Sequence, residues 1–518
     1  MRKSRDSSLE SLPGTLQFRV SAPMVLPDEV LAMTGEGEFF GNWDPSQALI
    51  LNDAFYPEWR INLPLSEIYE PFQYKFLILK KETKEVVAWE EMDNRICGFI
   101  KENPMCQIVV DGLRFANPRN DWKGAGTAIP VFSIRSEEDF GVGDFLDIKK
   151  MVDWCKRTGQ KVLQVLPIND TIKTGTWIDS YPYSANSSFA LHPMYLRPDA
   201  VGIINDLERR EHFRKVAYEL NQLPQIDYEA VNAAKDEYFR EIFNQNGKSD
   251  MNSDEYQCFF KKNKEWLAPY AAWRVLCEQY GTPDNSYWEE YAEYDSRKVA
   301  KFCKENLDKV SYHYFLQYHL DRQMKSVREY AHLHGVVLKG DIPIGVNRFS
   351  ADAWQYPNLF NMDCQAGAPP DDFSVLGQNW GFPTYNWEEM SKDGFKWWKD
   401  RFGKMSEYFD AYRIDHILGF FRIWQIPLDA VHGLLGYFNP ALPFSPEELR
   451  HNYDFWIDRD VQTNPLILEW MLTDFFGEYT DEVKASYLEY LPEGRYRLRP
   501  FVSTQRKVMS YFETLEKT

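Results

Sequence analysis

The feature that most limits the fold of this chain is a change of hydrophobic period near residue 126. Before it, short apolar runs alternate with turn residues, as in TLQFRV, ALIL, WRINLPL, FQYKFLIL, EVVAWE and CQIVV. Strands of this length cannot bury a face alone, so the stretch from Thr15 to Val110 predicts a β-sandwich. The Pro-, Asn- and Gly-rich segment at 116–126 is predicted to be a linker.

Beyond residue 126 strands and helices alternate. TAIPVFSIR indicates a buried strand, apolar residues at helical spacing follow from Phe145 to Cys155, and KVLQVLPIN indicates a second strand. This βαβ pattern implies parallel strands. Two more strands, GVVLKGDIPIGVN and FDAYRIDH, each follow a helix. The alternation predicts a (β/α)₈ TIM barrel, but only about four of its strands can be placed, so the barrel is expected to be incomplete in this chain.

The predicted organisation has three parts. Residues 1–14 form a tail, 15–115 a sandwich and 116–518 a partial barrel. Within the barrel, 196–310 is expected to be a mostly helical insertion. The segment 445–518 is expected to be a second, helical insertion without a further strand.

Composition excludes several kinds of partner. The net charge of −19 comes without a Lys/Arg cluster, which argues against nucleic acid and anionic membranes. Seven scattered cysteines without CxxC or Cys/His spacing indicate reduced thiols and no zinc site. With no apolar signal region or membrane-spanning stretch, the chain is predicted to be cytoplasmic. The aromatic content of 16% fits either a large core or a sugar-binding surface.

The segment AYRIDHILGFFRIWQIP carries the strongest chemical signal. Asp415 ends an apolar strand, two residues after Arg413 and directly before His416. A lone Asp at a strand end is most often a turn residue. Here Arg413 and Asp415 occupy alternate strand positions, so both side chains share a face and the arginine can keep the carboxylate ionised. An ionised, oriented carboxylate is what attack on an anomeric carbon requires.

Two further segments carry polar residues at strand ends or in long loops. KGDIPIGVNRFSADAW places Asp341 and Asn347 at a strand end, and GAPPDDFSVLGQNWGFPTYNW is a long loop with Gln378 and Trp380. The length and aromatic content of this loop favour substrate binding over an ordinary surface connection.

The segment DSYPYSANSSFALHP follows the second barrel strand and contains Asp179, Tyr183, Ser184 and Asn186. Its Ser and Asn residues could equally be turn formers.

In the predicted sandwich, turns and strand ends carry Trp43, Trp59, Lys75 and the run WEEMDNR. An exposed Trp needs a reason, although any one of them could lie in the core, and Trp59 is expected to do so. The set resembles the starch-binding domains of carbohydrate-binding module family 20. That resemblance implies a glucan site made by Trp43, Lys75 and Trp89, with Glu90 and Asn94 as polar partners.

The barrel segments, from about Lys123 to Pro427, resemble glycoside hydrolase family 77, the 4-α-glucanotransferases or amylomaltases. The matching patterns are GDxPI, PPDxFSxxGQxWGxP, RIDHxxGFxRxWxIP and PYSxxSSFAxHP, in the family's order. The resemblance implies Asp415 as nucleophile, Arg413 as its orienting partner and Asp341 as a carboxylate near the reacting sugar. It implies substrate-binding roles for Tyr183, Ser184, Gln378, Trp380 and His416.

The same resemblance implies the substrates. They are malto-oligosaccharides, maltose and glucan of the starch or glycogen type, with no metal and no organic cofactor. The pairing of the two domain types resembles the plant-cytosol members of the family, which carry an insertion after the nucleophile strand. This could explain the segment 445–518.

The sequence departs from the family in one respect. The (G/A)EDLGxxP segment with the acid/base Glu and the HD segment with a further Asp do not occur. Retaining chemistry needs a second carboxyl group, so the chain is expected to be truncated, to bind glucan and to turn over little. An α-amylase-like hydrolase and a non-catalytic glucan-binding scaffold are the alternatives.

Overall fold

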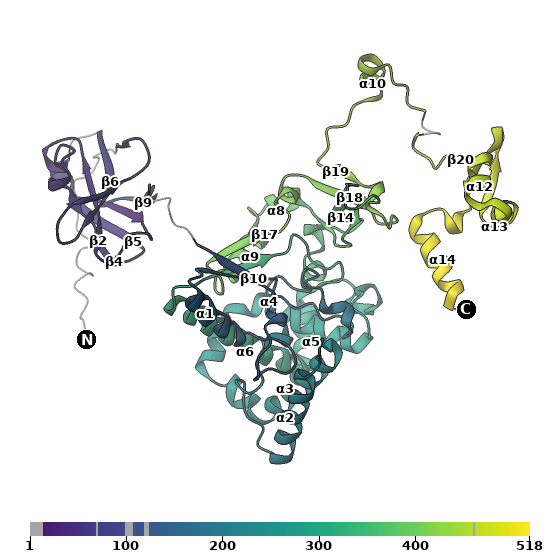
Figure 1. Cartoon of the computed structure of the whole chain (residues 1–518), viewed down its shortest axis with the longest axis horizontal. Helices are drawn as coiled ribbons and strands as arrows, with labels where there is room; N and C mark the ends of the chain where they lie inside the picture. Colours follow the sequence, from purple (N-terminus) through teal and green to yellow (C-terminus); the bar gives the residue numbers. More distant parts are fainter. Residues whose placement is uncertain (1–13, 69–70, 99–106, 119–123, 459–461, 518) are drawn as a thin grey trace. The chain divides into compact units, whose positions relative to one another are not determined.

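A computed structural model describes residues 14–68, 71–98, 107–118, 124–458 and 462–517. The chain forms two compact units, residues 1–123 and 124–518 (Figure 1). The division falls inside the stretch expected to be a linker, five residues of which (119–123) lie outside the described residues.

The N-terminal unit is a β-sandwich, which confirms the prediction. One sheet has the order β4-β5-β1-β9, and the other has the order β3-β2-β6-β7 with β8 paired to β6. Trp59 lies in the shared core with 2% of its surface exposed, as expected. The strands are β1 (Thr15–Ser21), β2 (Glu29–Gly35), β3 (Leu49–Ile50), β4 (Asn52–Phe55), β5 (Glu58–Pro64), β6 (Phe72–Lys80), β7 (Val86–Trp89), β8 (Arg95–Cys97) and β9 (Gln107–Arg114).

The second unit is built on four parallel strands. They lie in the order β10-β11-β12-β17, and every neighbouring pair is parallel. These are the four strands expected from the sequence, although the first is shorter than expected and gives way to a 3₁₀ turn. Their bounds are β10 (Gly126–Ile129), β11 (Val162–Val165), β12 (Val337–Ile342) and β17 (Ala411–Ile414).

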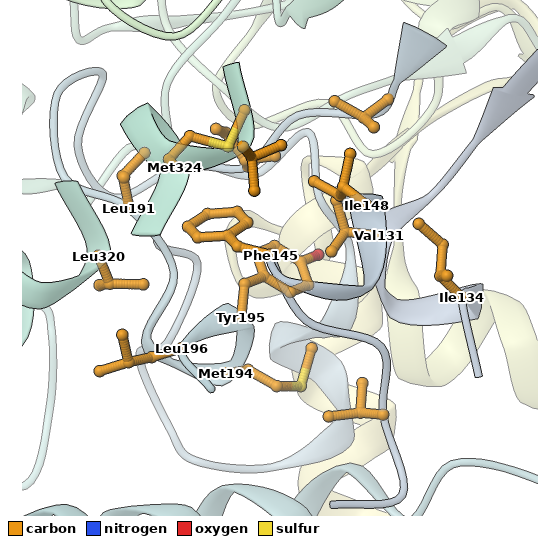
Figure 2. Close-up of a cluster of buried hydrophobic side chains, with 14 of the residues drawn as sticks. Val131, Ile134, Phe145, Ile148, Leu191, Met194, Tyr195, Leu196, Leu320 and Met324 are labelled. Atoms are coloured by element: carbon orange, nitrogen blue, oxygen red, sulfur yellow. The ribbon is translucent and has the colours of Figure 1, made fainter. Parts of the chain in front are cut away.

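The largest core of this unit lies between the parallel strands and the helices. Helix α1 (Asp147–Thr158) connects β10 to β11 and buries Ile148, Val152 and Cys155, which follow one another at helical spacing. Figure 2 shows the centre of the cluster around the Phe145 ring, with Ile148 and Val131 on one side and Met324 and Leu320 of α6 on the other. Burial of this apolar surface is the main source of stability for the sheet–helix contact.

Long helices fill the segment between β11 and β12 and gather on one side of the strands (Figure 1). Four of them begin at an Asp or Ser whose side chain accepts a hydrogen bond from a first-turn backbone N–H. Among the described residues no helix is both long and apolar enough to span a membrane. The helices are α2 (Leu207–Asn221), α3 (Tyr228–Met251), α4 (Asp254–Tyr280), α5 (Ser296–Glu305) and α6 (Leu307–Leu333).

The long loop that contains Gln378 closes as a hairpin. Strand β14 (Cys364–Ala368) pairs with β15 (Gln378–Asn379) on one side and β18 (Ile423–Pro427) on the other, and β19 (Tyr437–Asn439) completes this antiparallel sheet. The tip of the hairpin is open to solvent, and Phe373 is 97% exposed. The neighbouring elements are α7 (Ala351–Gln355), β13 (Phe360–Asn361), β16 (Thr384–Tyr385), α8 (Trp387–Ser391) and α9 (Lys396–Met405).

The segment after residue 445 differs from the expectation. It contains a three-stranded antiparallel sheet of the order β20-β22-β21, so the prediction of helices without a further strand was wrong. These strands have two to four residues, too few for alternation to be recognised in the sequence. The elements are α10 (Pro446–Tyr453), β20 (Ile467–Leu468), α12 (Glu469–Phe476), α13 (Thr480–Tyr487), β21 (Leu488–Leu491), β22 (Arg495–Leu498) and α14 (Gln505–Lys517).

An ion-pair network ties α4, α6 and the end of α9 together through Glu407. Its carboxylate oxygens lie 2.9 Å from Lys262, 3.0 Å from Lys325 and 3.4 Å from Lys404. Burial alone would raise the pKa of Glu407, but the three ammonium groups outweigh it and lower the pKa to about 2.

We therefore expect Glu407→Gln to destabilise the second unit by on the order of 3 kcal/mol at pH 7. A carboxyl with a depressed pKa stabilises the fold above its unfolded-state pKa, and this contribution is lost as the pH falls toward 2. Urea unfolding of variant and wild type at pH 7 and pH 3.5 measures the difference, which should shrink at the lower pH. A difference that is the same at both pH values would contradict this role.

Candidate active site

The site lies where β12 and β17 end side by side. Asp341 is opposite Arg413 in the parallel register, and Asp415 follows directly after β17. Because alternate residues of a strand point to the same face, Arg413 and Asp415 project together, next to Asp341. The carboxyl ends of barrel strands are where catalytic residues of this architecture gather.

Arg413 bridges the two carboxylates. Its Nη1 lies 2.6 Å from Oδ2 of Asp341, and its Nη2 lies 2.7 Å from Oδ1 of Asp415. The two carboxylates differ in access, because the Asp341 side chain is fully buried whereas that of Asp415 is 29% exposed. Asp415 is therefore the carboxylate that an incoming molecule can reach.

Tyr183 completes this cluster from the segment after β11. Its hydroxyl donates to Oδ2 of Asp341 at 2.8 Å and accepts from Nη1 of Arg413 at 3.3 Å. Burial raises the pKa of Asp341, while the hydrogen bonds from Tyr183 and Arg413 act in the opposite direction. Oδ1 of Asp341 is buried and has no hydrogen-bond partner among the described residues.

Ser184 contributes to the shape of the segment that carries Tyr183. Its hydroxyl accepts from Nδ2 of Asn347 at 3.0 Å and from Nζ of Lys173 at 3.4 Å. Asp179 is buried and accepts the backbone N–H groups of residues 173, 174 and 175. Lys173 was missed by sequence reasoning, since an isolated lysine in a polar segment carries no pattern.

The hairpin brings Trp380 next to His416, the residue that follows Asp415. Trp380 packs its ring edge-on against His416, with ring centroids 4.9 Å apart, and its Nε1 donates to Gln378 at 3.0 Å. Burial lowers the pKa of His416, so the imidazole is neutral at pH 7. The residue has a left-handed backbone conformation, φ 50°, directly after Asp415. The structure thus brings together the site residues expected in the barrel segment.

In the sandwich unit, strand register places two of the expected residues on one face. Lys75 and Leu77 alternate on β6, and Trp89 lies opposite Leu77, so Lys75 and Trp89 share that face. The backbone N–H of Trp43 donates to the carbonyl of Gly35, at the end of the neighbouring strand. Trp43, Lys75 and Trp89 are each partly exposed.

Glu90 and Asn94, expected as polar partners of this glucan site, differ in exposure. The Glu90 side chain is fully buried, accepts the Phe76 N–H at 2.8 Å and pairs with Arg95 at 2.9 Å. These contacts make Glu90 part of the sandwich interior, where it can support the glucan-binding face without lying on its surface. Asn94 is exposed and donates to Gln73 at 3.2 Å.

Comparison with known families agrees with both units. The family profile for glycoside hydrolase 77, 4-alpha-glucanotransferase, matches residues 129–496, and that for the family 20 starch-binding domain matches residues 15–107.

Individual relatives agree as well. The 4-alpha-glucanotransferase DPE2 of Oryza sativa subsp. japonica is 40% identical over 513 residues, which are 98% of this chain and 53% of the relative. The 4-alpha-glucanotransferase of Chlamydia caviae is 36% identical over 58% of this chain and 56% of its own length. The chain thus spans about half the length of these curated relatives.

Solved structures resemble the same region. An amylomaltase from Streptococcus agalactiae in complex with acarbose aligns with a TM-score of 0.53 and 25% identity, over 69% of this chain and 76% of that chain. The amylomaltase of Corynebacterium glutamicum shares the fold, with a TM-score of 0.50 and 17% identity over 83% of this chain and 57% of its own. With a family profile that covers more than two thirds of its residues, the chain belongs to the 4-alpha-glucanotransferase family, glycoside hydrolase 77.

Proposed function

We propose that this protein transfers α-1,4-glucosyl units between malto-oligosaccharides, including maltose, and a glucan of the starch or glycogen type. The observation that carries the proposal is the row Asp341–Arg413–Asp415, in which one guanidinium orients a reachable carboxylate beside a buried one. The location that we propose, the cytoplasm, is supported by cysteines whose spacing is typical of reduced thiols.

In the proposed mechanism Asp415 is the nucleophile. Its free oxygen attacks C1 of a bound glucosyl unit, and the glycosidic bond breaks as the departing sugar oxygen takes up a proton from the family's acid/base carboxyl, whose motif does not occur in this sequence. A covalent glycosyl-enzyme with inverted configuration forms. Arg413 keeps the carboxylate ionised and holds one of its oxygens, which leaves the other to react. A sugar hydroxyl then attacks C1 from the side of the departed group, gives its proton to that acid/base carboxylate, displaces Asp415 and restores the α configuration.

The remaining residues bind and shield the sugar. Asp341 lies buried beside the reacting unit, where its Oδ2 holds Arg413 in place and is itself fixed by Tyr183. Trp380 offers a ring face for stacking next to His416, and Gln378 lies at the exposed rim. Transfer exceeds hydrolysis when such subsites hold an acceptor sugar and keep water out.

Product analysis tests transfer against hydrolysis. With α-maltotriosyl fluoride as donor and maltose as acceptor, transfer yields longer oligosaccharides, which chromatography resolves from the free maltotriose that hydrolysis would release. Free maltotriose as the sole product would contradict a transferase. The fluoride leaves without being protonated, so formation of the glycosyl-enzyme does not require an acid residue. The attack of maltose still requires a base, so the transfer product should form slowly in this chain.

We also propose that the sandwich unit holds glucan on the face of Lys75 and Trp89, next to Trp43. An aromatic ring stacked on a sugar contributes roughly 1–2 kcal/mol, so we expect Trp89→Ala to weaken binding of the chain to insoluble starch about tenfold. The control is Trp59→Phe, a change in the core that leaves the surface intact. Sedimentation with starch granules measures both variants, and unchanged binding of Trp89→Ala would exclude this face as the site.

A further inference from the structure

A small cavity lies among α3, α4 and α6, and neither the barrel site nor the sandwich site includes it. Its volume is about 170 Å³, the space of about six water molecules, which is comparable to one hexose. Its polar lining comes from α3, α4 and α6, and apolar side chains such as Phe239 and Leu316 form the rest of the wall. The polar lining residues are Asn232, Lys235, Asp236, Arg240, Arg274, Glu278, Tyr312 and His313.

Part of this polar lining has hydrogen-bonding capacity that the chain does not use. Nε of Arg274 is buried without a partner in the part of the chain that the structure describes. His313 is 5% exposed, and its closest charged partner is Glu278, whose carboxylate lies 3.8 Å from Nε2, beyond hydrogen-bond reach. Buried polar groups in native proteins are nearly always paired, so the unpaired Nε of Arg274 implies an occupant with a polar atom.

Other residues of the lining add one donor and two acceptors. Lys235 is 1% exposed and donates to the carbonyls of Met194 and Leu196, at 2.6 and 3.1 Å, which uses two of its three N–H groups. Burial lowers the pKa of Lys235 to about 8, so the ammonium form predominates at pH 7. Nδ2 of Asn232 donates to the Tyr228 carbonyl, and the side-chain oxygen of Asn232 can act as an acceptor. Glu278, half exposed at the mouth, is the second acceptor.

The charges of the wall decide between a neutral and an anionic occupant. Lys235, Arg240 and Arg274 are cations, and two carboxylates, Asp236 and Glu278, share the wall with them. A third carboxylate, Asp170, lies 3.8 Å from Arg274. The cations are thus balanced, and no excess charge attracts an anion. Donors and acceptors in one small cavity match hydroxyl groups, which act as both.

From this combination of cavity size, unpaired polar groups and balanced charge, we propose that the cavity binds a single neutral hexose, with free glucose as the chemical type. Glu278 and Asn232 accept its hydroxyl protons, and Arg274, Lys235 and His313 donate to its oxygens. Phe239, Leu316 and Tyr312 supply apolar contacts to the sugar ring.

The cavity is connected to the barrel site through Arg274. Its Nη1 donates to the carbonyl of Ile172 at 2.6 Å, and Ile172 itself lines the cavity. The same carbonyl accepts Nδ2 of Asn186 at 2.8 Å, so it anchors both ends of the segment that carries Tyr183. A hexose that immobilises Arg274 therefore also restrains the segment 172–186. Binding here is independent of turnover at Asp415, so the two proposals can fail separately.

Glucose titration of the full 518-residue chain tests the proposal. Trp43→Ala, Trp89→Ala and Asp415→Asn together form the background, so that the other glucan sites do not obscure the result. Saturation-transfer NMR should detect D-glucose with a dissociation constant on the order of 1–10 mM, as expected for a ligand of about twelve heavy atoms. Hydrogen exchange of residues 172–186 should slow when glucose is bound.

Glu278→Gln distinguishes the possible occupants. The variant loses a charged acceptor and should bind glucose about tenfold more weakly. An anion such as sulfate would instead bind this variant more tightly, because a negative charge is removed from the mouth. Glu265→Gln, an exposed residue of the same helix outside the cavity, is the control and should match the background. Glucose affinity unchanged by Glu278→Gln, no glucose binding up to 100 mM, or sulfate binding in place of glucose would each overturn the proposal.

Discussion

Asp415→Asn is expected to abolish the release of fluoride from α-maltotriosyl fluoride, with a rate loss of at least about four orders of magnitude, or about 5 kcal/mol in the barrier. An amide has no anionic oxygen to attack C1, whereas Arg413 and the strand ends remain in place. The wild-type chain should gain the mass of a maltotriosyl group on the peptide that contains Asp415. Mass spectrometry of the digested protein locates the label.

The covalent intermediate should accumulate in this chain. Its breakdown requires a base to activate the acceptor, and the family's acid/base motif does not occur in the sequence. Asp429→Asn is the matched control, because Asp429 is an exposed aspartate outside the cluster. Fluoride release by Asp415→Asn at the wild-type rate, or a label on another residue, would show that Asp415 is not the nucleophile.

Arg413→Met is expected to lower the free energy of unfolding of the second unit by about 3 kcal/mol at pH 7. The substitution leaves the fully buried carboxylate of Asp341 without its cation. Because the Arg413 side chain is 41% exposed, the cost should fall at the lower end of the range for broken buried pairs. Denaturant unfolding, followed by tryptophan fluorescence, measures it.

The pH dependence of the free energy of unfolding of Arg413→Met tests whether the buried charge of Asp341 causes the loss of stability. Burial already raises the pKa of Asp341 in the folded chain, and loss of Arg413 raises it further. A carboxyl with a higher pKa folded than unfolded stabilises the fold when protonated, so the variant should regain stability as the pH falls from 8 to 5. In the double variant Asp341→Asn/Arg413→Met this regain should disappear. If the single variant lost the same stability at every pH, the buried charge would not be the cause.

Strands were predicted correctly from the sequence where their apolar runs were long, and were missed where the strands were short. The parallel strands were recognised because apolar runs such as KVLQVLPIN lie between amphipathic helices. In those helices apolar residues recur at helical spacing, so the continuous apolar runs are easily told apart from them. The strands β20, β21 and β22 were missed because they are too short to show alternation of apolar and polar residues. They are recognised only from their antiparallel pairing with one another.

The candidate site was predictable in its residues but not in its contacts. Motifs placed Asp341, Arg413 and Asp415 at strand ends, and parallel pairing then brought these ends together. The hydrogen bond from Tyr183 to Asp341 joins residues that are 158 positions apart in the sequence. It depends on the path of the segment after β11, which no local sequence pattern predicts. The burial of Glu90 could not be predicted, because it follows from Arg95 and the Phe76 backbone, which only the folded sandwich brings together.

The left-handed backbone at His416 restricts which mutations the neighbourhood of Asp415 can tolerate. Any residue with a side chain pays roughly 1–2 kcal/mol to hold φ near 50°, and a β-branched residue fits this region worst. Substitution of His416 by Val or Ile would therefore change the backbone conformation next to Asp415. This effect is separate from the loss of the imidazole. Glycine or asparagine would keep the left-handed backbone at position 416. The requirement for this backbone conformation is therefore separate from any requirement for an imidazole side chain.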